Sequence, residues 1–255
     1  LGRVKIQIDD PTTTDPDPPA ELGSEDFTLE FWVKIDSGDN TAGSVSCGAD
    51  TSWRNGNIIF DRDRFNQGRD FGLSLANGTL AFGASTDSES RTICGATNLE
   101  DNAWHHVAVQ RRASDGYLWI YVDGVLDAEG DGPDGDISYP DDGTPGSFCG
   151  SNGDEPCTDS DPFLVVGAEK HDADYGVMLS FEGLITEIHL SNTLRYDGAF
   201  TIPSERFTPD ASTAALYQFS EGYGNVLSDA AGLSPSGDRN YGGSPNGPAW
   251  TTDSP

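Results

Sequence analysis

The sequence of 255 residues predicts an all-β fold in which two antiparallel sheets pack face to face. Short segments with alternating apolar and polar residues recur along the chain, and 31 glycines and 15 prolines supply turns between them. Runs rich in Ala, Leu, Glu and Lys, as long helices require, are missing. About eleven short strands joined by tight turns are typical of a sandwich. All-β sandwiches reach this length as one unit, so we expect residues 1–255 to form a single domain.

The N-terminal residues 1–8 predict a strand, because Val4, Ile6 and Ile8 alternate with polar residues. Residues 9–23 form an arm rich in Pro, Thr and Asp, in which prolines remove backbone donors and favour extended conformations. A strand on such an arm can complete its own sandwich or join a neighbouring copy. Consecutive elements usually lie side by side, which favours the chain's own sheet.

The clearest strand spans residues 27–35, where Phe27, Leu29, Phe31, Val33 and Ile35 share one face. Further strands are expected within 56–60, 70–84, 104–112, 116–126, 162–168 and 184–190. The pairs Asn77-Gly78 and Asp123-Gly124 stand between alternating segments and predict two-residue hairpin turns.

Two segments lack any strand pattern. Residues 127–161 form a long acidic stretch without periodicity, and loops of that length are usually functional or disordered. Residues 222–255 are rich in Gly, Ser and Pro and predict a C-terminal extension outside the sheets.

Four blocks of the sequence, taken together, carry a family resemblance. They read "DFTLEFWVKID", "DNAWHHVAVQRRASDGYLWIYVDGVL", "FEGLITEIHLSNTLRYDGAF" and "ALYQFSEGYGNVLSDAAG". In this order they resemble the laminin-G-like domains of the concanavalin A-like lectin/glucanase superfamily. The resemblance implies a two-sheet jelly roll that serves in adhesion or recognition, often with calcium and sometimes attached to a carbohydrate-active enzyme. Thr186 and His189 stand where the family more often has a carboxylate and an arginine.

Adjacent histidines in "NAWHHVAVQRR" first suggest a metal site or a catalytic pair. In a strand, however, neighbouring side chains point to opposite faces. His105 and His106 therefore cannot bind one ion together, and we expect one of them to be a half-buried, hydrogen-bonded group.

The formal net charge is −29, with 43 acidic and 14 basic residues. Such a chain is repelled by phosphate backbones and anionic membranes, which excludes nucleic acid as a partner. No apolar run approaches the roughly 20 residues that span a bilayer, so we expect no membrane insertion. The acidic residues either keep the surface soluble or supply oxygen ligands to calcium.

The four cysteines allow three pairings. The turn-rich segment between Cys149 and Cys157 favours a disulfide between its ends, which leaves Cys47 to pair with Cys94. Disulfides indicate an oxidising compartment, so we expect a secreted or cell-surface protein. The start at Leu1 is consistent with a processed chain.

Acidic side chains after the strand at 162–168 are the first candidates for a calcium site. The segment "AEKHDADYG" provides Glu169, Asp172 and Asp174, and Asn55 can join them from a facing loop. A second acidic group, in the long loop, comprises Asp131, Asp134, Asp136, Asp141 and Asp142. The alternative is a solvated acidic surface without an ion.

Aromatic rings in predicted loops are candidates for glycan binding, because pyranose C–H groups stack on aromatic faces. These residues are Trp53, Tyr139, Tyr175 and Tyr223. The alternative is local packing within the loops. Asn77 begins an N-glycosylation pattern, although it stands in the hairpin turn.

Catalysis is not expected, and we assign no catalytic residue. Retaining glucanases on jelly rolls place two carboxylates on one strand with E-x-D-x-E or E-x-D-x-x-E spacing, which this sequence lacks. The sequence thus predicts an extracellular recognition or adhesion domain that binds glycans or glycosylated surfaces with calcium assistance. Two alternatives remain: a subunit of a cell-surface fibre, joined to copies of itself through residues 1–8, and an accessory module of a carbohydrate-active enzyme.

Overall fold

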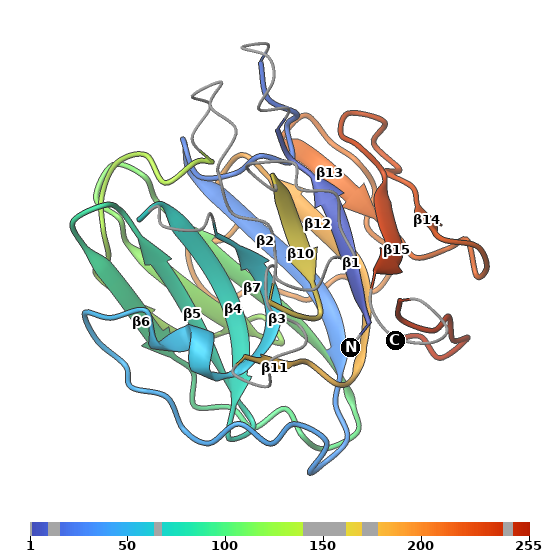
Figure 1. Ribbon diagram of the computed structural model, residues 1–255, viewed down its shortest axis with the longest axis horizontal. Coiled ribbons are helices and arrows are strands. Elements are labelled where there is room, and N and C mark those ends of the chain that lie inside the picture. The colour runs from blue at the N-terminus through green and yellow to red at the C-terminus, as the bar shows by residue number, and fades with distance from the viewer. Residues whose placement is uncertain (1, 10–15, 64–67, 140–161, 170–177, 242–246) are drawn as a thin grey trace.

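A computed structural model describes residues 2–9, 16–63, 68–139, 162–169, 178–241 and 247–255, whose strands form two sheets packed face to face (Figure 1). In the nine-stranded sheet the order is β14 (Val226–Leu227), β15 (Gly237–Tyr241), β1 (Arg3–Gln7), β10 (Phe163–Val166), β3 (Asn57–Arg62), β4 (Asp70–Ala76), β5 (Thr79–Ser85) and β6 (Ser90–Cys94), with β11 (Leu179–Ser180) also on β3. The six-stranded sheet runs β13 (Thr213–Tyr217), β12 (Leu184–Ser191), β2 (Phe27–Lys34), β7 (Trp104–Arg111), β8 (Leu118–Val122) and β9 (Val125–Gly130). Every pairing is antiparallel except that of β11 with β3. The predicted fold class is confirmed.

The core lies between the facing sides of the two sheets. The apolar residues of β2 that alternate along the strand are at most 1 % exposed and belong to this core. Phe27 packs on Phe71 of β4 with ring centroids 4.9 Å apart, and Phe31 meets Phe60 of β3 edge-on at 5.0 Å. Both contacts join one sheet to the other, so the alternation read from the sequence identifies the buried face of β2.

Both expected hairpin turns are present. Asn77 and Gly78 have φ of 52° and 80°, and Asp123 and Gly124 have φ of 50° and 77°. Positive φ at both central residues is the backbone of a type I′ turn, which matches the twist of the flanking strands. The turns set the registers of β4 with β5 and of β8 with β9.

β1 lies inside the nine-stranded sheet of its own chain. It pairs with β10 on one side and with β15 on the other, and Val4 and Ile6 enter the core. Both edges of β1 are therefore occupied by the same chain. A neighbouring copy would have to displace one of them before it could pair there, which disfavours assembly through residues 1–8.

The C-terminal region differs from expectation. Residues 222–255 were expected to lie outside the sheets, but β14 and β15 extend the nine-stranded sheet, and Leu227 is buried in the core. β15 lacks apolar alternation, which is why its sequence does not indicate a strand. Its pairing with β1 stabilises the extended backbone, because strand formation depends strongly on tertiary context.

The described part of the proline-rich arm also packs on the sandwich. Ala20 and Leu22 are 2 % and 3 % exposed and contact the core. Between them, Glu21 accepts a hydrogen bond from the Tyr139 backbone N–H at 2.5 Å. Burial raises the pKa of Glu21 from 4.5 to about 7, although the charge of Arg62 opposes the shift.

We predict that this carboxyl makes the protein less stable at pH 8 than at pH 5. A pKa raised in the folded state gives stability that is complete below pH 4.5 and is lost as pH rises through about 7. The variant Glu21→Gln should therefore lose less in melting temperature than the wild type between pH 5 and pH 8. Glu25→Gln removes the same charge from an exposed position of the same segment and should leave the pH dependence unchanged. Equal behaviour of the two variants would contradict the assignment.

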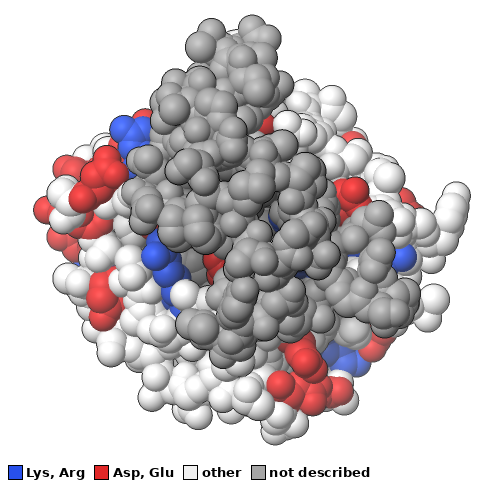
Figure 2. Space-filling view, viewed as in Figure 1, with Lys and Arg blue, Asp and Glu red and all other residues white. Residues whose placement is uncertain are grey.

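A disulfide joins Cys94 at the end of β6 to Cys47, 47 positions earlier. Cys149 and Cys157 lie outside the described residues. No helix in the described ranges is long and apolar enough to cross a membrane. On the face shown in Figure 2, acidic side chains form separate groups around the rim and basic ones are few.

Candidate functional site

Two adjacent strands of the six-stranded sheet bring two tryptophans and a lysine to its outer face. The outward side chains of β2 are Thr28, Glu30, Trp32 and Lys34, since the residues that alternate with them enter the core. Lys34 pairs in register with Trp104 at the start of β7, and Trp32 pairs with His106. The sheet therefore fixes the spacing of Trp32, Lys34 and Trp104.

A cavity of about 710 Å³ opens beside these residues. It is lined by Trp32, Trp104, the first half of β12 and the segment 248–255 with Trp250. Residues of the nine-stranded sheet, including Val4 and Leu227, complete it. Its size suits a small ligand, and the three half-buried tryptophans give it apolar faces.

The segment 248–255 is held to the sandwich by polar contacts. Trp250 donates its indole N–H to the Gly224 carbonyl at 2.9 Å. Asp253 accepts from Lys34 Nζ at 2.8 Å through Oδ2 and from Trp104 Nε1 at 3.1 Å through Oδ1. These two bonds lower the pKa of the Asp253 carboxyl, so it carries its charge at neutral pH.

Charged groups in the cavity wall are largely engaged with the protein. Glu187 on β12 accepts from Arg206 Nε at 2.5 Å and from the Phe207 backbone N–H at 2.9 Å. Both oxygens of this carboxylate are thus used to fasten the segment around Arg206. Glu187 is 4 % exposed, so its role is structural.

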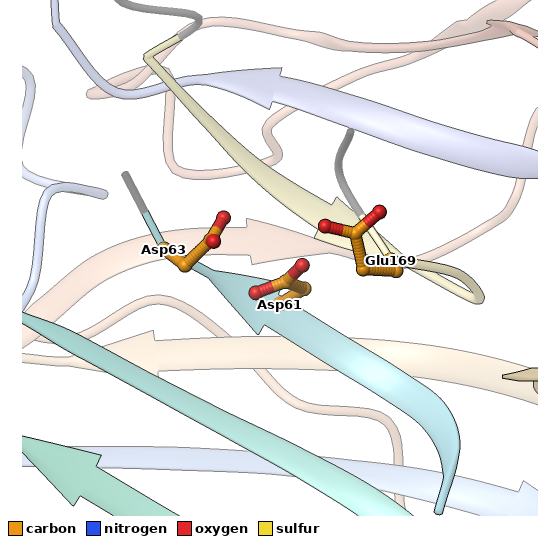
Figure 3. A group of neighbouring side chains, drawn as sticks. All are labelled: Asp61, Asp63 and Glu169. Atoms are coloured by element: carbon orange, nitrogen blue, oxygen red, sulfur yellow. The ribbon is translucent and has the colours of Figure 1, made fainter. Parts of the chain in front are cut away.

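A second candidate lies on the outer face of the nine-stranded sheet (Figure 3). Asp61 on β3, Asp63 just after β3 and Glu169 just after β10 place carboxylate oxygens within 4.8 Å of one another. β3 and β10 are adjacent, which is why residues more than a hundred positions apart meet. All donors are oxygens, the type that a hard cation such as calcium prefers.

The surroundings of this carboxylate group are partly cationic. Burial lowers the pKa of Arg54, but the charges of Asp70, Asp63 and Asp61 raise it above its ordinary value. Arg3 donates to the backbone carbonyl of Glu169 at 3.2 Å. A bound ion would therefore compete with the charge of Arg54 for these carboxylates.

Two of the aromatic residues expected to bind glycans are buried. Trp53 and Tyr139 are each 1 % exposed, so neither ring can stack on a sugar in this structure. Trp53 packs over β4 and β5 together with Ile58 and Ala81. Tyr139 lies in the main core beside the proline-rich arm. Their flanking Ser, Asn, Gly and Pro residues suggest open loops, but the rings fold back onto the sheets.

The other expected residues are placed as follows. Tyr223 is 82 % exposed, away from the cavity wall, and Tyr175 lies outside the described residues. Of the expected calcium ligands, Glu169 joins Asp61 and Asp63, and Asn55 is exposed. Asp172, Asp174, Asp141 and Asp142 lie outside the described residues. Within the described ranges, Asp131, Asp134 and Asp136 form no comparable group.

Sequence reasoning missed Asp61, Asp63, Trp32, Trp104 and Trp250. A signal for the first pair exists, because "IIFDRD" puts two acids at i and i+2 on one face of a strand. Trp32 also stands on the polar face of β2, where a large apolar ring needs a partner. The contribution of Trp250 depends on the path of the C-terminal region and has no local signal.

The sequence of residues 9–166 matches a laminin G family model described as the concanavalin A-like lectin/glucanases superfamily. The chain belongs to this family. A solved structure of a carbohydrate binding protein from Bacteroides ovatus, called "putative" in its description, is similar with a TM-score of 0.50 and 15 % identity. The match covers 93 % of this chain and 56 % of that one, so the laminin-G-like chain spans little more than half of that relative.

Two further solved structures have lower TM-scores. A pentraxin from Limulus polyphemus gives a TM-score of 0.38 and 16 % identity, covering 78 % of this chain and 77 % of that one. The structure of mouse laminin α1 domains LG4–5 gives a TM-score of 0.40 and 12 % identity, and the match covers 82 % of this chain and 48 % of that one. No curated protein sequence matches the chain.

Proposed function

We propose that this laminin-G-like domain is an extracellular, non-catalytic recognition module that binds glycans in the cavity beside β2, β7 and β12. The observation that carries the proposal is the set of Trp32, Trp104 and Trp250 around a space of about 710 Å³. Tryptophan faces stack on pyranose C–H groups, while nearby polar groups orient the hydroxyls. The fold shared with the Bacteroides ovatus protein, described as carbohydrate binding, supports the same ligand class.

Recognition without catalysis fits the groups that line the cavity. Hydrolysis of a glycosidic bond requires two carboxyl groups that flank it. Three acidic side chains line the cavity among the described residues: Glu205 is exposed, whereas Glu187 is held by Arg206 and a backbone N–H, and Asp253 is held by Lys34. While these contacts last, neither Glu187 nor Asp253 can act as a nucleophile or proton donor, so Glu205 has no second available carboxyl beside it among the described lining residues.

Glycan binding can be tested directly. The intact domain should bind a subset of a neutral and acidic glycan array, and calorimetry on the best neutral ligand should show at least a tenfold loss for Trp250→Ala, about 1.4 kcal/mol. Trp119→Ala is the matched control, because Trp119 is a half-buried tryptophan on β8 that does not line the cavity. The proposal fails if no glycan binds, or if both variants weaken binding equally.

We further propose that calcium binds Asp61, Asp63 and Glu169. An ion that binds only the folded state stabilises it, by about 2.7 kcal/mol when the free ion concentration is 100 times its Kd. Calcium should therefore raise the melting temperature, and a chelator should reverse the rise. Asp63→Asn should abolish it, whereas Asp39→Asn, an exposed position outside the group, should not. A response that survives in Asp63→Asn would place the ion elsewhere.

A further inference from the structure

Asp253 and Trp104 line the cavity, and the Asp253 carboxylate is bound between Trp104 and Lys34, which lies beside the lining. Each oxygen of this carboxylate has a different donor: Lys34 Nζ lies 2.8 Å from Oδ2, and Trp104 Nε1 lies 3.1 Å from Oδ1. Lys34 and Trp104 are cross-strand partners on β2 and β7, so the sheet fixes the distance between the two donors. One charged and one neutral donor, set side by side, form a receptor for a planar carboxylate.

The residue that occupies this receptor is weakly held. Thr251, Thr252, Asp253, Ser254 and Pro255 are exposed. Among the described residues, the hydrogen bonds that anchor this stretch to the strands are the two that Asp253 accepts. Exposed ion pairs contribute little net stability. Exchange of the Asp253 carboxylate for another carboxylate would therefore release residues 251–255 with little loss elsewhere.

The aromatic groups around the receptor suggest the rest of the ligand. Trp104 donates its N–H to the carboxylate, so the same indole that marks the receptor lines the cavity, next to Trp32 on β2. A sugar acid has its carboxylate on the pyranose ring. Its carboxylate can take the place of Asp253 while the ring lies against an indole face.

We propose that the cavity selects saccharides that bear a carboxylate, which displaces Asp253 from Lys34 and Trp104. This inference rests on the proposed glycan binding and narrows its ligand class. The net charge of −29 opposes approach of an anion, but that repulsion is screened beyond about 8 Å at 0.15 M salt. The direct contact with Lys34 acts at 2.8 Å, inside that distance.

The test uses matched pairs of oligosaccharides on an array and in calorimetry at 0.15 M salt. Each pair consists of a uronic-acid oligosaccharide and its methyl ester, which has the same rings without the charge. We expect the free acid to bind at least tenfold more tightly than the ester. Asp253→Asn should strengthen binding of the acids severalfold and leave the esters unchanged. Asp39→Asn, which removes an equal charge from an exposed site away from the cavity, should change neither.

Lys34→Met should remove the preference for the acids while it retains binding of the esters, which also shows that the variant is folded. If acids and esters bind equally, or if Lys34→Met keeps the preference, the carboxylate receptor is wrong although glycan binding stands. If acids bind only to Asp253→Asn, the receptor is confirmed and Asp253 blocks it fully in the wild type. If no member of any pair binds either protein, both this inference and the proposed glycan binding fail.

Discussion

Replacing Glu30 by Gln is expected to lower the stability of the domain by about 3–5 kcal/mol, the usual effect of removing one partner from a buried ion pair or its equivalent. Glu30 is 1 % exposed on the outer side of β2. Its carboxylate accepts from Tyr196 Oη at 2.6 Å and from His106 Nε2 at 3.1 Å on one oxygen, and from His189 Nδ1 at 3.0 Å on the other. The Arg195 side chain lies 3.6 Å away.

The neighbours of the two histidines indicate which ring nitrogen donates to Glu30. His189 Nε2 lies 3.3 Å from a guanidinium nitrogen of Arg195, which can only donate, so Nε2 accepts and Nδ1 carries the proton toward Glu30. His106 Nδ1 is buried and has no hydrogen-bond partner among the described residues, so Nε2 carries the proton. Both rings therefore donate to the Glu30 carboxylate. In Glu30→Gln the amide NH₂ would face one or more of these donors instead of accepting from them.

The pH dependence follows from the same contacts. Burial raises the pKa of Glu30, but hydrogen bonds from His106, His189 and Tyr196 lower it by more, so that the pKa is about 2. A pKa below its unfolded value of 4.5 gives stability that is complete above pH 4.5 and is lost as pH falls toward 2. The difference in stability between wild type and Glu30→Gln should shrink over that range.

Urea unfolding at pH 7 measures the effect, and a drop of roughly 10 °C in melting temperature should accompany it. Glu89→Gln removes the same charge from an exposed position and should change the stability by less than about 0.5 kcal/mol. A difference of less than 1 kcal/mol between the two variants would mean that the Glu30 network contributes little.

The Glu30 network also marks what the sequence could and could not predict. Alternation assigned Phe27, Leu29 and Phe31 to the core correctly, and it placed His105 and His106 on opposite faces. The alternation could not show that other side chains bury the outer face of β2 at Glu30. That cover includes Tyr196, more than 160 positions away, and no local pattern encodes a contact of that kind.

In the candidate sites, too, local sequence patterns do not reveal contacts between distant residues. Glu169 was predicted as a metal ligand from its place after an apolar strand, whereas Asp61 and Asp63 join it only because β3 and β10 are neighbours. Strand order is a property of the whole fold, so local spacing cannot reveal it. The same limit explains why Trp53 was predicted as a surface ring, although the sheet beneath it was predicted correctly.

Replacement of Trp53 is the second change expected to lower stability strongly. Its indole lies on β4 and β5 over Gly72 and Gly83, which face each other in register. A Cβ added at either glycine would overlap ring carbons of Trp53. The two glycines thus form a slot for the ring, and Arg54, beside Trp53, pairs with Asp70 at 2.6 Å. The glycines are required by a close approach rather than by backbone conformation.

We expect Trp53→Ala to lower stability by about 3–5 kcal/mol, because it removes a large buried ring. Gly83→Ala alone should lower it by about 1–3 kcal/mol through overpacking against the indole. In the Trp53→Ala background the same Gly83→Ala change should have little effect or stabilise, because the added methyl then enters the space that the ring has left. The measured free energies of unfolding should therefore be strongly non-additive.

Tyr223→Ala is the control, since Tyr223 is 82 % exposed and its removal should change stability by less than about 0.5 kcal/mol. Additive effects of Trp53→Ala and Gly83→Ala would show that the ring does not occupy the glycine slot in solution. In that case Trp53 would again be a candidate for surface stacking on a sugar. A large coupling energy instead assigns Trp53 to the sandwich, and the cavity beside β2 and β7 remains the candidate for ligand binding.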